Sequence, residues 1–128
     1  MNKAFILLLI GAGGFLGSIA RYALSVALMP VIAGFPLGTL TVNIAGSFLI
    51  GLLSELTVSA KPISPDLKLL LITGFCGGFT TFSSYLFDSS LLLKEGNLFL
   101  SLLYLSGNLV GGFMALYAGI TFARLFSS

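Results

Sequence analysis

Hydrogen-bonding side chains recur at helical spacing in two apolar parts of this sequence. One row, spaced i, i+4, i+8, is Thr39, Asn43 and Ser47, and the other, spaced i, i+3, i+7, is Ser101, Tyr104 and Asn108. That spacing places each row on one face of a helix. A polar side chain in hydrocarbon needs a partner, so each row either bonds to a neighbouring helix or lines a polar path. Both rows contain hydrogen-bond donors and neither contains an acidic residue, so a path that they line would bind an anion better than a cation.

The stretch GFCGGFTTFSSYLFD at 74–88 is a second candidate for chemistry. Paired glycines followed by threonine and serine are poor helix formers, which predicts an unwound break near Gly77–Thr80. Freed backbone at membrane depth is tolerated only where it is buried in protein or lines a cavity, and its carbonyl groups can hold a small cation. We therefore expect this break to have a functional role.

Aromatic residues follow this break on one helical face, at Phe79, Phe82 and Tyr85, and the acid Asp88 comes next. An aromatic ring has a positive edge, so a ring presented edge-on favours a small anion without trapping it on a full charge. Most of the twelve phenylalanines are better interpreted as packing residues. Phe82 differs because polar residues flank it.

The composition requires a membrane setting for this chemistry. The 128 residues are 57% hydrophobic and 8% charged, with a mean hydropathy of +1.12, far from soluble averages of about 25% charged. Histidine is absent, Cys76 is the single cysteine, and the charged residues form no cluster typical of a metal site or a hydrolase. No basic run suits nucleic acid. The sequence thus favours a non-enzymatic, all-α membrane protein.

Four apolar segments divide the chain into four predicted transmembrane helices within one domain, 1–128. Prolines and charged residues separate them, and their approximate ranges are 4–29, 37–58, 67–93 and 98–124. The N-terminal run with Ser18-Ile19-Ala20 could also be a signal peptide with a cleavage site. We favour a full span, because the apolar pattern continues to Met29.

Charge and glycine content bear on orientation and packing. Lys3, Lys61, Lys68 and Arg124 fall on one side of such a bundle, and Arg21 and Lys94 on the other. This weak bias favours cytoplasmic termini and is compatible with insertion in both orientations. Small residues four apart allow close helix approach in lipid. Such pairs are Gly13 with Gly17, Gly14 with Ser18, Ser47 with Gly51, and Gly107 with Gly111.

Three sequence blocks together resemble one known family. GGFLGSIARY at 13–22, GTLTVNIAGSFLIG at 38–51 and GFCGGFTTFSSYLFD at 74–88 are similar, in the same order, to blocks of the Fluc (CrcB) fluoride channels. Each glycine motif alone is weak, but the set is specific. The chain length and the four-span layout also match, so the resemblance covers essentially the whole chain.

The resemblance implies an antiparallel, dual-topology homodimer in the bacterial plasma (inner) membrane, in contact with lipid. It implies two fluoride pores built from both subunits and a structural sodium ion (Na+) at the dimer interface, held by backbone carbonyls of Gly77 and Thr80. Asn43 would donate to fluoride and the edge of the Phe82 ring would line its path. Arg21 would lie at a vestibule. The remaining implied pore positions are Thr39, Ser84, Tyr85 and Tyr104.

Two residues depart from the family pattern, which has phenylalanine in place of Tyr85 and usually glutamate in place of Asp88. These departures leave open a heterodimer with a paralogous chain, although we favour the homodimer. The implied activity is passive export that lowers cytoplasmic fluoride. Alternatives are a small multidrug-type dual-topology transporter and a non-transporting assembly subunit. The first would need an acid in the first helix, which carries Arg21 instead, and the second would have no use for a break in the third.

Overall fold

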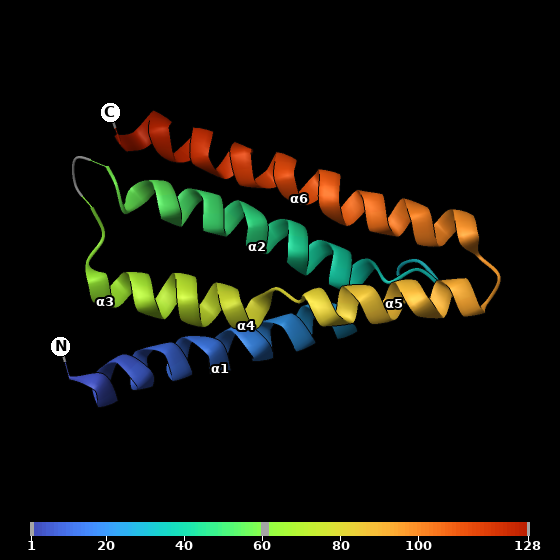
Figure 1. Ribbon diagram of the computed structural model, residues 1–128, viewed down its shortest axis with the longest axis horizontal. Coiled ribbons are helices and arrows are strands. Elements are labelled where there is room, and N and C mark those ends of the chain that lie inside the picture. The colour runs from blue at the N-terminus through green and yellow to red at the C-terminus, as the bar shows by residue number, and fades with distance from the viewer. Residues whose placement is uncertain (1, 60–61, 128) are drawn as a thin grey trace.

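The computed structural model describes residues 2–59 and 62–127, all helical or loop (Figure 1). Its elements are α1 (Lys3–Leu28), α2 (Leu37–Leu56), α3 (Pro65–Lys68), the π-helix η1 (Leu69–Cys76), α4 (Gly77–Phe79), α5 (Phe82–Lys94) and α6 (Leu98–Ser127). Four helical segments are long and apolar enough to cross a membrane: Lys3–Leu28, Leu37–Leu56, Pro65–Lys94 and Leu98–Ser127. The chain is therefore an all-helical, multi-pass membrane protein. The first segment is one continuous helix of 26 residues, longer than the apolar part of a signal peptide.

The third segment changes its backbone conformation along its length. Its first part is α3, followed by the eight π-helical residues of η1 and the short α4. Thr80 and Thr81 then adopt extended conformations before α5 begins at Phe82. Gly77 and Gly78, where the sequence places the start of the break, are helical in the structure. The extended residues are instead the two β-branched threonines, whose side chains disfavour helix and favour extended backbone.

The two parts of the third segment pack against different helices. η1 and α4 lie against α1, whereas α5 lies against α6, and α2 makes its most extensive contact with α6. Figure 1 shows this order, with α1 and α6 at opposite edges of the bundle. The two extended threonines fall at the point where the segment exchanges one neighbour for the other.

Glycines bring the helix backbones into contact. A Cβ atom added at Gly13 would clash with the carbonyl oxygen of Leu70, and one added at Gly17 would clash with that of Phe75. These two glycines, four residues apart, form the groove of α1 that receives η1. In lipid the hydrophobic effect does not drive helices together, so the van der Waals contacts that close approach allows stabilise their packing.

Both termini lie at the same end of the bundle as the connection between α2 and α3 (Figure 1). An ion pair of 2.9 Å between Arg124 Nε and Glu55 Oε1 ties the end of α6 to the end of α2 there. Lys3 and Lys68 belong to this end, and Lys94 to the other. Lys61 lies outside the described residues.

Candidate functional site

A cavity of about 240 Å³ opens beside the extended threonines and is here called the central cavity. Its lining consists of Asn43, Ser47, Ile50, Thr80, Thr81, Phe82, Tyr85, Asn108 and Leu109. These residues come from α2, α5, α6 and the extended pair. None of them is an acid or a base, so the central cavity offers hydrogen bonds and ring surfaces without a full charge.

The side-chain amide of Asn43 holds the extended backbone at Thr81. Asn43 Oδ1 accepts a hydrogen bond of 2.8 Å from the Thr81 N–H, and Asn43 Nδ2 donates one of 3.1 Å to the Thr81 carbonyl. The amide thus supplies both partners that a neighbouring strand would supply in a sheet. Backbone groups released at membrane depth need such partners. Asn43 therefore directly stabilises the extended pair Thr80 and Thr81, here called the interruption of the third segment.

Asn108 of α6 completes this amide network. Asn43 Nδ2 also donates to Asn108 Oδ1 at 3.0 Å, and Asn108 Nδ2 donates to the Tyr104 carbonyl at 3.0 Å. Rotating either amide by half a turn would place acceptors against acceptors, so the network fixes both orientations. Both N–H hydrogens of the Asn43 amide are therefore occupied by protein acceptors in this conformation.

The interruption leaves backbone groups of both polarities without partners. Over residues 2–59 and 62–127, no hydrogen bond is made by the N–H groups of Phe82 and Ser83 or accepted by the carbonyls of Gly77, Gly78, Phe79 and Thr80. The N-terminus of α5 is capped by the Thr81 hydroxyl, which accepts from the Ser84 N–H at 3.2 Å. A helix N-terminus carries partial positive charge, and unpaired carbonyl oxygens carry partial negative charge. The same interruption can thus attract an anion on one side and a cation on the other.

Aromatic rings form one wall of the central cavity. The ring of Phe82 is 69% exposed in this chain and lies 5.7 Å from the ring of Tyr85 at an angle of 50°. The Tyr85 ring is buried, and its hydroxyl donates to the carbonyl of Leu105 at 2.8 Å. Its hydroxyl is therefore directed at the α6 backbone, and Phe82 is the ring with a free edge.

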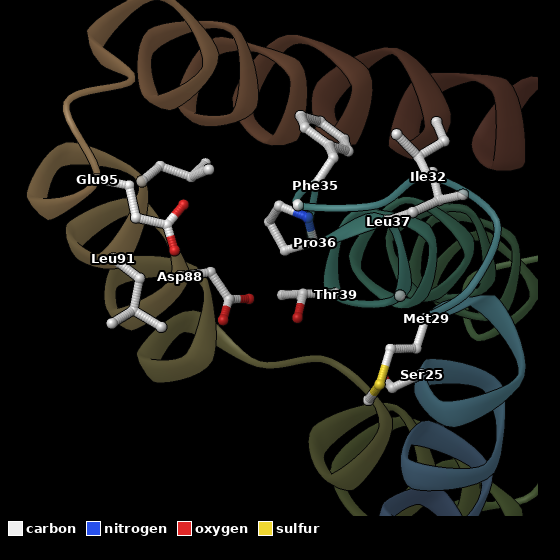
Figure 2. A pocket seen from close by; sticks show the side chains of 13 residues that line it. Ser25, Met29, Ile32, Phe35, Pro36, Leu37, Thr39, Asp88, Leu91 and Glu95 are labelled. Atoms are coloured by element: carbon white, nitrogen blue, oxygen red, sulfur yellow. The ribbon is translucent and has the colours of Figure 1, made fainter.

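A second cavity of about 310 Å³, the end cavity, lies between the α1–α2 loop and α5 (Figure 2). Figure 2 shows the side chains of Thr39 and Asp88 projecting into it from α2 and α5, with the carboxylate of Glu95 further out. Asp88 Oδ2 accepts a hydrogen bond of 3.1 Å from the hydroxyl of Tyr104. Tyr104 is fully buried, with its ring 5.6 Å from that of Tyr85. Buried aromatic residues thus connect the two cavities.

The predicted site residues fall into three groups. Those that line the central cavity are Asn43, Thr80, Phe82 and Tyr85. Thr39 lines the end cavity, and Tyr104 lies buried between the two. Arg21 and Ser84 are half-buried and line neither cavity, and Gly77 is exposed, with open space where a Cβ atom would be.

Sequence reasoning missed the role of Thr81 as the residue that Asn43 holds and as the cap of α5. A threonine three residues before a serine in an apolar run is a weak capping signal, and the apolar surroundings hide it. Asn108 was noticed as part of a polar row but was not assigned to a site. Its contact with Asn43 spans 65 residues, which no local pattern reveals.

Comparison with known proteins identifies the family. The model for the family described as CrcB-like protein, Camphor Resistance (CrcB), matches residues 8–120. A fluoride-specific ion channel, FluC, of Chlorobium luteolum is 57% identical over 127 residues, covering 99% of this chain and 98% of that protein. A protein of the same name from Methanocaldococcus jannaschii is 47% identical over 113 residues, covering 88% and 90%. This chain therefore belongs to the CrcB family.

Proposed function

We propose that this chain is a fluoride-specific ion channel that exports fluoride passively. The observation that carries the proposal is identity of about half or more, over nearly the whole chain, to relatives named as such channels. The sequence blocks that resemble the family contain Asn43 and Phe82, which meet at one cavity in the fold. Family membership and site geometry therefore support the same activity.

The central cavity has the chemistry that a small, strongly hydrated anion needs. Fluoride must exchange its water for donors that bind it firmly enough to admit it and weakly enough to release it. The neutral amides and hydroxyls of the lining, the N–H group of Phe82 and the edge of the Phe82 ring meet this requirement. The lining holds no fixed cation that would trap the ion.

Transport through such a path needs no coupled proton or second ion. A membrane potential of 100 mV contributes about 2.3 kcal/mol per elementary charge, and it drives an anion out of a cell that is negative inside. We propose the bacterial inner membrane as the location and the lowering of cytoplasmic fluoride as the result. The multidrug-type alternative lacks support, because α1 carries no acid that could exchange protons for a cationic drug.

An antiparallel homodimer would complete both the pore and a cation site. The Gly77 position is open, and Phe82, which lines the central cavity, is mostly exposed in the single chain. Among the residues that the structure describes, no donor bonds to the carbonyl oxygens of Gly77 and Thr80. Oxygen ligands of this kind suit a hard cation such as sodium. Two copies of the interruption would bring such carbonyls together at their interface. When bound, sodium would accept the lone pairs of these carbonyl oxygens and join the subunits.

Labelling of a single cysteine tests the dual topology. Asp66 is exposed in α3, at the start of the third segment, and Asp66→Cys in a Cys76→Ser background presents one thiol at this end of the bundle. In intact cells, an impermeant maleimide should label part of the population, and permeabilised cells should give the rest. Labelling of all or none of the protein in intact cells would contradict dual topology.

Growth in fluoride tests both the function and the sufficiency of a single chain. A bacterium that lacks its own fluoride exporter should regain growth in fluoride when it expresses this chain alone. Rescue that appears only with a second, paralogous chain would favour the heterodimer over the homodimer. A well-expressed chain that gives no rescue under either condition would contradict the proposed function.

A further inference from the structure

Asn108 is nine-tenths buried and faces the one part of the Asn43 amide that the Thr81 backbone does not use. Asn43 binds Thr81 through Oδ1 and through one Nδ2 hydrogen, which leaves its second Nδ2 hydrogen for Asn108 Oδ1 at 3.0 Å. Both asparagines line the central cavity, and Asn108 is 8% exposed. The Asn43–Asn108 bond is thus a contact between two side chains that face the cavity.

The bonds of the Asn43 amide differ in what their loss would cause. Losing the bonds to Thr81 would release extended backbone at membrane depth, where unpaired groups are costly. Losing the bond to Asn108 would move no backbone, and an anion in the cavity could replace the Asn108 oxygen as the acceptor. The hydrogen shared with Asn108 is therefore the one that Asn43 can offer to an ion without loosening the interruption.

We propose that Asn108 is a positioning residue that acts as an internal acceptor, occupying the ion-binding N–H of Asn43 whenever no fluoride is there. This inference rests on the proposed fluoride channel function. An anion is a stronger acceptor than a neutral amide oxygen, so fluoride displaces Asn108 Oδ1. The returning amide oxygen then helps the ion to leave. Asn108 thereby weakens fluoride binding at Asn43 and speeds release.

Two substitutions of Asn108 should shift fluoride affinity in opposite directions. Asn108→Leu keeps the branching of the side chain and removes the acceptor, so the fluoride concentration for half-maximal flux should fall about fivefold, the effect of one net neutral hydrogen bond. Its maximal flux should also fall, because release becomes slower. Asn108→Asp keeps an acceptor oxygen and adds a charge that repels the ion, so its half-maximal concentration should rise above that of the parent. Damage to packing alone would not separate the two variants in this way.

The experiment measures initial fluoride efflux against fluoride concentration in liposomes that hold purified parent or variant. Ser106→Ala is the matched control on α6, because the Ser106 hydroxyl is exposed and bonds to carbonyls of its own helix. It should match the parent in both parameters. If Asn108→Leu does not give a monodisperse protein, Asn108→Ser, whose hydroxyl is too short to occupy the place of the amide oxygen, should lower the half-maximal concentration in the same direction.

The outcomes separate this inference from the proposed function. A parent that conducts fluoride, with an unchanged or higher half-maximal concentration in Asn108→Leu, would overturn the inference and leave the channel function standing. A parent that conducts no fluoride would overturn both. A lower half-maximal concentration in Asn108→Leu together with a higher one in Asn108→Asp is the result that supports the inference.

Discussion

Asn43 and Thr81 form a two-bond pair across 38 residues of sequence, with the Asn43 amide accepting from the Thr81 N–H at 2.8 Å and donating to the Thr81 carbonyl at 3.1 Å. The pair joins α2 to the one place in the third segment where the backbone is extended. A single side chain thus serves as the hydrogen-bonding partner of a backbone interruption. Because the same amide lines the central cavity, the backbone interruption and the proposed ion path share this residue.

Asn43→Asp should impair both stability and transport. A carboxylate has no N–H to offer the Thr81 carbonyl or Asn108 Oδ1, and unsatisfied buried groups cost about 1–3 kcal/mol each. A charge 4 Å from a passing anion adds a repulsion of about 4 kcal/mol at an effective dielectric constant of about 20. We expect a lower melting temperature in detergent and fluoride efflux from liposomes reduced by at least about tenfold.

Asn97→Asp is the matched control for this change, since Asn97 lies exposed in the turn before α6. It should leave fluoride efflux unchanged. Undiminished efflux through Asn43→Asp would remove Asn43 from the ion path.

Much of the fold follows from the sequence, because span length and hydropathy are properties of single segments. The all-helical, four-span architecture and the family resemblance are confirmed. The location of the extended residues was harder to predict from the sequence. Propensity predicts a break near Gly77–Thr80. Gly77 and Gly78 remain helical, and the extended residues are Thr80 and Thr81, where the Asn43 amide supplies hydrogen-bond partners for the Thr81 backbone. A tertiary contact determines the position of the interruption, and local propensities carry no information about that contact.

The candidate site shows the same limit. The rows of polar side chains on the second and fourth segments were visible from spacing, but spacing does not say that Asn43 and Asn108 bond to each other. Likewise, Tyr85 was visible as a departure from the family pattern, whereas the bond from its hydroxyl to the Leu105 carbonyl depends on how α5 packs on α6. The assigned roles of the pore residues stay predictions that the following variants test.

Phe82→Ile should leave the fold intact and abolish most fluoride transport. The ring is 69% exposed in the single chain, so its replacement by a smaller apolar group costs little packing within that chain. It removes the positive ring edge that the proposed path offers to the anion. Phe87→Ile is the matched control, because Phe87 is 60% exposed on the same helix and lines neither cavity. Equal efflux from both variants would contradict the ring-edge mechanism.

Tyr85→Phe should lower stability slightly and keep fluoride efflux within severalfold of the parent. It removes one hydrogen bond, from the Tyr85 hydroxyl to the Leu105 carbonyl, worth about 1 kcal/mol. The ring, which lies beside Phe82, is retained. Thermal unfolding and a fluoride-electrode assay measure the two effects. A strong increase in efflux would show instead that the tyrosine disables this pore, as expected for one subunit of a heterodimer.

Gly46→Ala should destabilise the protein through one identifiable clash. A Cβ atom at Gly46 would overlap with the methyl group of Thr80, and overpacking of this kind costs about 1–3 kcal/mol. Thr80→Ser removes that methyl group and keeps the backbone carbonyl, so it should restore much of the lost stability in the double variant. Gly11→Ala, which meets open space, should have little effect. Additive losses for Gly46→Ala and Thr80→Ser would rule out this contact as the cause.

The central claim is that this chain alone forms a passive, fluoride-selective pore, and the most direct measurement is ion efflux from liposomes that contain only the purified protein. Matched liposomes are loaded with potassium fluoride or potassium chloride, and a potassium ionophore is added to balance the charge that an anion carries out. We predict rapid fluoride efflux that starts only when the ionophore is added, stops in Phe82→Ile and has no counterpart for chloride. Fluoride efflux no faster than from protein-free liposomes, or equal efflux of chloride, would contradict the account.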